Sequence, residues 1–115
     1  MTVGTDVLEI ERAAQIEKIK HKVFTNNELL YIEKFENKSE HFAGIFAAKE
    51  AVFKCLNLKF LAHQEIEILH NENGKPYVCF YGETLNYFMK NFKSIDISLS
   101  HSRTIATSVA VAVKK

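Results

Sequence analysis

Residues 41–56, HFAGIFAAKEAVFKCL, carry the strongest helical signal in this chain. The stretch holds no proline and many good helix formers, and either Asn37 or Ser39 can cap a helix that begins just before it. Gly44 lies inside the stretch, where a glycine costs about 1 kcal/mol relative to alanine. We therefore predict a central helix over His41–Leu56, with another backbone or a ligand closely approaching Gly44.

The residues before this helix predict one strand and two further helices. Val3–Ile10 is rich in β-branched residues and alternates between two faces, as a strand does. Glu11–Lys20 has apolar residues at helical spacing and predicts a surface helix. Thr25 precedes Glu28 by three residues, the signature of a capping box, so a second helix is expected to begin near Thr25.

The residues after the central helix predict mainly strands. Glu65–Leu69 and Pro76–Phe80 flank a turn-forming segment and read as a hairpin. Gly82–Phe92 places Leu85, Phe88, Met89 and Phe92 on one helical stripe, and Ile95–Leu99 and Ile105–Val113 are expected to be two more strands. The fold class is therefore α+β, an antiparallel sheet packed with helices.

The length and net charge of the chain predict its number of domains and exclude some classes of partner. The 115 residues fall below the usual size of two domains, so residues 1–115 are expected to form a single domain. Fifteen basic and fourteen acidic residues give a net charge of +1, which argues against recruitment of nucleic acid or membrane by overall charge. Cys55 and Cys79 read as reduced, buried thiols. With no membrane-spanning run, we expect a cytoplasmic protein.

Two carboxylates stand out. Asp6 shares a strand face with Leu8 and Ile10, where a carboxylate is costly unless it is paired or metal-bound; alternatively it is a surface residue at the strand edge. Glu50 precedes Lys54 by four residues, the favourable order for a helical ion pair. If Asp6 and Glu50 converge, they can hold Mg²⁺ and leave positions for water and phosphate oxygens.

A polar cluster follows the predicted strand Ile95–Leu99. Residues 98–103 contain serines, His101 and Arg103, which together can donate hydrogen bonds to phosphate oxygens. The alternative is a polar strand end entering a turn. The remaining histidines, which lack the spacing of metal ligands, are expected at the surface; they are His21, His41, His63 and His70.

Four segments in order resemble the bacterial holo-[acyl-carrier-protein] synthase family, a group of 4′-phosphopantetheinyl transferases. They are GTDVLEIER at 4–12, FAAKEA at 46–51, NGKPY at 73–77 and ISLSHS at 97–102. Each segment alone is a weak signal, but their order, their spacing and the total length together are specific. The resemblance covers nearly the whole chain.

The resemblance implies transfer of 4′-phosphopantetheine from coenzyme A to a serine of apo acyl carrier protein, for fatty acid biosynthesis, with Mg²⁺ as cofactor. Asp6 and Glu50 would be the metal ligands, and Glu50 or a metal-bound water would accept the serine proton. Lys54 would neutralise phosphate charge. The remaining expected contacts to coenzyme A are Ser100 and His101 at the phosphates, and Asn73, Gly74, Lys75 and Pro76 at the adenine and ribose.

The resemblance also implies partners. An acidic carrier protein would dock on a basic surface supplied by Arg12, Lys18 and Lys22, although an ordinary solvated helix face explains the lysines equally well. The family forms homotrimers with active sites between subunits, so an apolar sheet face is expected to be covered by a neighbour.

Two departures from the family pattern qualify this interpretation. Ile45 stands where the family commonly has an arginine that holds coenzyme A phosphate. Either Lys38, Lys49, Arg103 or a residue of another subunit compensates, or the nucleotide is held less tightly. Leu58–Gln64 lacks a glycine-rich loop of the family type. The alternatives are a non-catalytic coenzyme A or nucleotide-binding module, which the change at Ile45 favours, and a trimeric structural subunit, which leaves the cluster around His101 unexplained.

Overall fold

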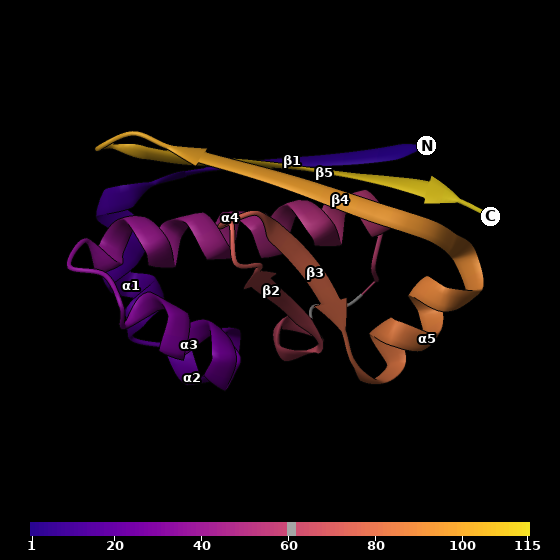
Figure 1. Ribbon diagram of the computed structural model, residues 1–115, viewed down its shortest axis with the longest axis horizontal. Helices are drawn as coiled ribbons and strands as arrows, with labels where there is room; N and C mark the ends of the chain where they lie inside the picture. The colour runs from indigo at the N-terminus through magenta and orange to yellow at the C-terminus, as the bar shows by residue number, and fades with distance from the viewer. Residues whose placement is uncertain (60–61) are drawn as a thin grey trace.

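A three-stranded antiparallel sheet lies across one long helix in the computed structural model, which describes residues 1–59 and 62–115 (Figure 1). The helix, α4, spans Lys38–Leu56 and is buried along most of its length. The sheet has the order β1-β5-β4, with β1 at Thr2–Glu9, β5 at Ile105–Lys114 and β4 at Phe92–His101. The predicted central helix and these three strands are confirmed, and the segment Leu58–Gln64 includes the two residues outside the described ranges.

Short helices cover the N-terminal half of α4. A 3-10 turn at Ile10–Arg12 leads into α1 (Ala13–Glu17), α2 (Lys20–Val23) and α3 (Asn26–Ile32). The single helix predicted over Glu11–Lys20 is therefore wrong. The chain leaves helical geometry at Ile19, whose side chain is 46% exposed, whereas Ile16 and Val23 on either side are buried. The break lets both of these side chains enter the core.

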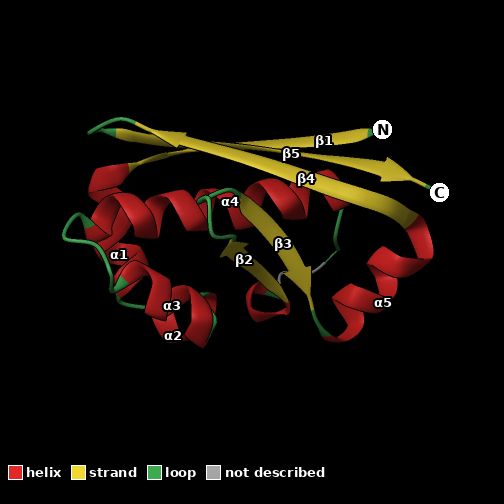
Figure 2. Cartoon of the chain, viewed as in Figure 1, coloured by secondary structure: helices red, strands yellow, loops and turns green. Residues whose placement is uncertain are grey.

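A hairpin and a last helix complete the layer opposite the sheet (Figure 2). The hairpin pairs β2 (Ile66–His70) with β3 (Pro76–Phe80), as predicted, and α5 spans Gly82–Asn91. The apolar stripe predicted for α5 is only partly right, because Leu85 and Met89 are exposed and Thr84 is the buried residue of the helix. The α+β class with antiparallel pairing is confirmed.

Glycine allows β1 to approach α4 closely. A side chain at Gly4 would overlap the backbone of Ala51 and Cys55, so the strand and the helix can meet here only through a bare Cα. The Ser108 hydroxyl on β5 donates a 2.6 Å hydrogen bond to the Ala47 carbonyl and ties the sheet to the same helix. The close approach predicted at Gly44 is wrong as regards backbone, because its position faces open space.

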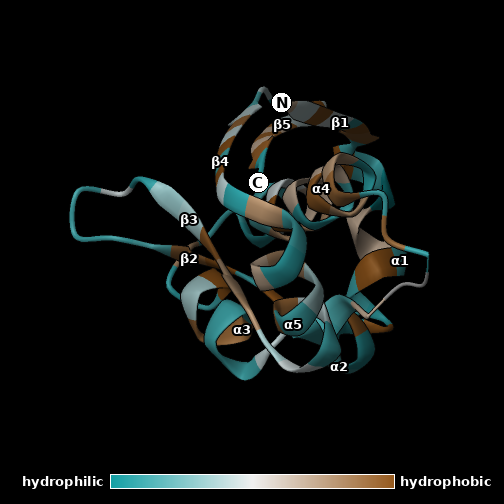
Figure 3. Cartoon of the chain, turned by 90° about the vertical axis from the view of Figure 1, so that its right-hand side faces the viewer, coloured by the Kyte–Doolittle hydropathy of each residue, from teal (hydrophilic) through white to brown (hydrophobic). Residues whose placement is uncertain are grey.

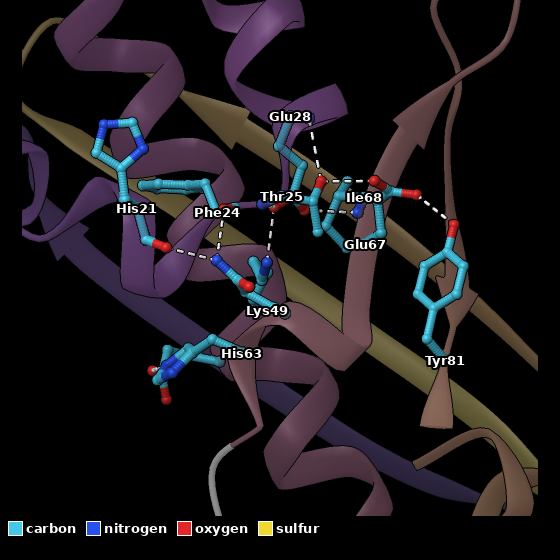
Figure 4. Close-up of polar contacts among 11 residues, drawn as sticks. His21, Phe24, Thr25, Glu28, Lys49, His63, Glu67, Ile68 and Tyr81 are labelled. Atoms are coloured by element: carbon cyan, nitrogen blue, oxygen red, sulfur yellow. Dashed lines mark hydrogen bonds and ion pairs between the residues drawn. The ribbon is translucent and has the colours of Figure 1, made fainter. Parts of the chain in front are cut away.

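A buried charged network joins α3, α4 and β2 (Figure 4). The Lys49 ammonium lies 2.7 Å from Glu28 Oε1, and both side chains are fully buried. The other Glu28 oxygen accepts a hydrogen bond from the Ile68 amide. Thr25 forms the predicted capping box with Glu28, and its hydroxyl also donates to Glu67. Lys49 is therefore committed to the core, and the expectation that it could reach a phosphate is wrong.

The state of the two cysteines and the search for a membrane-spanning helix test two further expectations. Both cysteines are free, but only Cys55 is buried, because Cys79 is partly exposed on β3. Within residues 1–59 and 62–115, no helix has the length and apolar character needed to cross a membrane.

Candidate active site

Asp6 is paired rather than freely solvated. It lies on the face of β1 that packs on α4, and its side chain is 16% exposed. Lys54 Nζ lies 3.1 Å from Asp6 Oδ1 and donates a second hydrogen bond to the Thr5 carbonyl at 3.0 Å. Lys54 thus spans from helix to strand, instead of forming the ion pair with Glu50 that the spacing predicts within α4.

Glu50 lies one helical turn before Lys54 on α4. Its carboxylate oxygen Oε1 lies 3.3 Å from His63 Nε2. The His63 ring is half-buried and packs edge-on against Phe53 at 5.2 Å between ring centroids. The expectation that His63 is a surface residue is therefore wrong. Nothing in the sequence pairs His63 with Glu50, because thirteen residues and the end of the helix separate them.

The donor set formed by Asp6 and Glu50 fits Mg²⁺. Asp6 and Glu50 come from neighbouring elements and are each partly exposed, and Asp6 pairs with Lys54, whose ammonium can neutralise phosphate. Residues 1–59 and 62–115 contain no group of three or more His, Cys, Asp or Glu side chains able to hold a metal by themselves. Mg²⁺ in phosphate-handling sites is commonly held by one or two carboxylates, with water and substrate oxygens in the other positions.

His101 lies in a second cluster. Its Nδ1 is 3.4 Å from Glu40 Oε2, near the start of α4. Glu50 follows Glu40 by ten residues, so the two clusters lie about 15 Å apart along the helix. The structure therefore does not bring His101 to Asp6 and Glu50 within one chain. His101 and Ser100 instead line a cavity of about 220 Å³.

Of the four hairpin residues expected to contact coenzyme A, Gly74 lines this cavity. Gly74, with a positive φ of 89°, lines it, whereas Asn73 and Lys75 are exposed and Pro76 is half-buried at the start of β3. The Lys75 amide donates to the side chains of Asn71 and Asn73, which holds the turn in shape. Figure 3 shows the hydrophilic tip of this hairpin projecting away from the helices.

Two more histidines line the cavity. His41 on α4 and His70 on β2 are half-buried, so the expectation of surface positions is wrong for both. His21, the fourth, is exposed as expected. Apolar spacing misses both histidines because their stacking partners lie on other elements. Tyr31 on α3 stacks on His70, and Phe35, in the segment after α3, stacks on His41.

The basic residues expected to bind a carrier protein are all exposed. Arg12 lies in the 3-10 turn beside a cleft lined by Val7 and Ile105, whereas Lys18 ends α1 and Lys22 lies in α2. They belong to three separate short elements rather than to one helix face.

Comparison with known proteins shows the family to which this chain belongs. The model of the 4′-phosphopantetheinyl transferase superfamily matches residues 2–113. The chain belongs to this superfamily. It is 41% identical to a holo-[acyl-carrier-protein] synthase of Fusobacterium nucleatum over 95% of both chains. It is 42% identical to one of Caldanaerobacter subterraneus, over 96% of this chain and 93% of the relative.

A solved transferase structure shares the fold. The holo-[acyl-carrier-protein] synthase of Helicobacter pylori in complex with coenzyme A matches with a TM-score of 0.81 and 26% identity, covering 96% of this chain and 98% of that chain. The resemblance found in the sequence motifs is confirmed by these comparisons. Ile45, the residue expected to depart from the family pattern, is buried and lines the cavity beside His101.

Proposed function

We propose that this protein is a holo-[acyl-carrier-protein] synthase. It transfers 4′-phosphopantetheine from coenzyme A to a serine of apo acyl carrier protein in the cytoplasm, releases adenosine 3′,5′-bisphosphate and supplies fatty acid biosynthesis. The observation that carries the proposal is the Asp6–Lys54 ion pair, one helical turn from Glu50 along α4, in a chain whose relatives carry that name. Two free cysteines suit a reducing compartment.

Asp6 and Glu50 would hold Mg²⁺, which would act as a Lewis acid on the pyrophosphate of coenzyme A. The chain's own contribution is charge and position. Displacement at phosphorus builds negative charge on the non-bridging and leaving oxygens, which a nearby ammonium stabilises. Lys54 supplies that ammonium, and its hydrogen bond to the Thr5 carbonyl holds it over β1.

Glu50 is also the residue placed to accept the serine proton. His63 contacts its Oε1 atom, which leaves Oε2 available on the partly exposed side of the carboxylate. An adjacent carboxylate within hydrogen-bond reach of a hydroxyl can act as a general base. We assign this role to Glu50 on that geometry.

The nucleotide end of coenzyme A would lie against Ser100, His101 and the turn at 73–76. Because His101 and Glu50 are about 15 Å apart along α4, one chain does not complete the site around a single pyrophosphate. We therefore propose a homotrimer in which neighbouring subunits combine these two clusters. The exposed apolar face of the sheet, with Val3 at 61% and Val7 at 63% exposure, supports such an interface.

The acidic carrier protein would dock near Arg12, with Lys18 and Lys22 at the margin. Charge complementarity of this kind speeds encounter and selects the partner. Arg12 is the best placed of the three, because it lies at the end of the strand that carries Asp6.

The test is transfer itself. Purified protein is incubated with apo acyl carrier protein, coenzyme A and Mg²⁺, and the intact mass of the carrier is measured. We expect the mass of one phosphopantetheine arm to be gained, and the gain to be lost in Asp6→Ala and in Glu50→Ala. Glu83→Ala, which removes an exposed carboxylate from α5 instead, is the matched control and retains the gain.

A non-catalytic binding module predicts a different result. Such a protein would bind coenzyme A and leave the carrier mass unchanged with every carrier tried. The relatives named as synthases and the presence of both carboxylates disfavour that alternative. In the transfer assay, we expect turnover to be lost when Mg²⁺ is omitted.

A further inference from the structure

Three imidazole rings wall the cavity of about 220 Å³ at the start of α4. His41 comes from α4, His70 from the end of β2 and His101 from the end of β4. The His41 and His101 ring centroids are 6.0 Å apart. Three separate elements therefore converge with the same titratable side chain on one small space.

Aromatic side chains hold two of these rings in place. The Tyr31 ring stacks on His70 with 3.9 Å between centroids and only 2° between planes. The Phe35 ring stacks on His41 at 3.7 Å. Both aromatic residues come from α3 or the segment just after it. Stacked rings lose rotational freedom, so the imidazole nitrogens have fixed directions before any ligand arrives.

The hydrogen-bonding capacity of the cluster is unfilled. The Nδ1 atom of His70 is buried and has no hydrogen-bond partner among the described residues. The Glu40 carboxylate engages Nδ1 of His101, which leaves Nε2 of that ring available. A buried polar atom without a hydrogen-bond partner is energetically unfavourable. A ligand oxygen that bonds the imidazoles would remove this cost.

The charge of the wall depends on protonation. Among the described residues that line the cavity, Glu40 is the carboxylate and none is a lysine or an arginine. Ile45 is the α4 residue at the position where the family arginine is expected. The other titratable group is the Tyr31 phenol from α3. A neutral cluster therefore carries a net negative charge, whereas protonated imidazoles make it positive. Only the protonated cluster can hold an anion.

Both buried rings resist protonation in the free protein. Burial, with a smaller contribution from His101, lowers the pKa of His41. Burial, with a smaller contribution from His41, lowers the pKa of His70. A bound dianion would reverse this by favouring the charged rings. Binding would then draw protons from solution, and affinity would fall as pH rises through the pKa of the liganded rings.

We propose that His41, His70 and His101 bind a phosphate group of coenzyme A as imidazolium rings, so that capture of the cosubstrate is coupled to proton uptake. This inference rests on the proposed transferase function. The shared chemistry is a phosphate, which can be either the 3′-phosphate or the pyrophosphate of the cosubstrate. In this arrangement the imidazoles supply the positive charge that Ile45 cannot.

The test measures binding separately from turnover. Calorimetric titration of coenzyme A without Mg²⁺, in two buffers of different ionisation enthalpy, gives the number of protons taken up. We expect net uptake near pH 7 and at least about tenfold weaker binding at pH 8 than at pH 6. Repeating the titration with dephospho-coenzyme A distinguishes the two phosphates: lost uptake assigns the 3′-phosphate, and retained uptake assigns the pyrophosphate.

The double variant H41Q/H70Q removes the two rings that α3 positions and keeps polar side chains of similar size. Its affinity is expected to be weak and nearly independent of pH, whereas His21→Gln, at an exposed histidine, matches the wild type. Comparison at each pH cancels the titration of the ligand itself. In the wild-type protein, imidazole nitrogen NMR gives the same answer without substitution, because the ring pKa values are expected to rise when coenzyme A is added.

Absence of proton uptake, or ring pKa values that stay fixed on adding coenzyme A, would overturn the inference. Phosphopantetheine transfer measured at one pH tests the proposed function independently. Transfer without proton uptake rejects the imidazole site alone, whereas proton-coupled binding without transfer rejects the enzyme and leaves the site.

Discussion

Lys49 forms a fully buried ion pair with Glu28 and so contributes to the stability of the fold. Lys49 is adjacent in sequence to Glu50, but the helix directs the two side chains to different surroundings: the core for Lys49 and the site for Glu50. Burial raises the pKa of Glu28 and lowers that of Lys49, and their mutual contact opposes both shifts. Each charge thus depends on the other for compensation.

Lys49→Met is expected to destabilise the fold by about 3–5 kcal/mol, because it leaves the Glu28 carboxylate buried without a counter-charge. The midpoint of urea unfolding measures this loss. E28Q/K49M should recover most of it, since the double change removes both charges together. Lys93→Met, at an exposed position on β4, controls for the change in residue type. Equal midpoints for Lys49→Met and Lys93→Met would show that the buried pair contributes nothing.

The short helix α3 contacts both the buried charged network and the histidine cavity. Its capping box at Thr25 fixes where the helix begins, and the same hydroxyl donates to Glu67 on β2. Its ring at Tyr31 stacks on His70. A helix of two turns therefore connects the core network with the imidazole cavity.

Thr25→Ala is expected to cost about 2 kcal/mol, at the upper end for an N-cap, because the acceptor of the Glu28 amide and the donor to Glu67 are lost together. Thermal unfolding gives the size of the effect, and faster hydrogen exchange of the Glu28 amide locates it. Thr25→Ser keeps the hydroxyl and should retain most of the stability. If the serine variant is as unstable as the alanine variant, the missing hydrogen bonds are not the cause.

The helices and strands that the sequence predicts correctly are those whose defining residues lie close together in the chain. The capping box, the hairpin and the central helix all follow from residues within one element of each other. The ion pair expected between Glu50 and Lys54 within the helix is not formed, because Asp6 and His63 arrive from outside the helix and pair with Lys54 and Glu50 respectively. The convergence of Asp6 and Glu50 on a metal stays a prediction. The break at Ile19 and the histidine cavity depend on tertiary packing, which no short-range pattern contains.

At the scale of the whole molecule, one face of the sheet remains apolar and uncovered. Val7 on β1 and Val113 on β5 are among the exposed large side chains, and both point away from α4. A patch of this kind on a small protein marks an interaction site.

Val7→Lys is therefore expected to convert the proposed trimer into monomers, with little loss of monomer stability, because the side chain is already 63% exposed in the isolated chain. Light scattering coupled to gel filtration measures the mass, and circular dichroism checks the fold. Phosphopantetheine transfer should fall together with trimer content. Leu30→Lys, at an exposed apolar residue of α3 instead of the sheet, serves as the matched control. A wild-type mass equal to one chain would contradict the proposed assembly.

The position of β5 between β1 and β4 has a consequence for biosynthesis. The register pairs Thr2 with Ala112 and Asp6 with Ser108, so β1 can pair with its neighbour only after nearly the whole chain has been made. Chains are made from the N-terminus, and contacts between distant residues form slowly. A prematurely terminated product would have α4 but no completed sheet, and a ribosome-bound chain would not yet be an enzyme. Activity thus begins only after translation has passed β5.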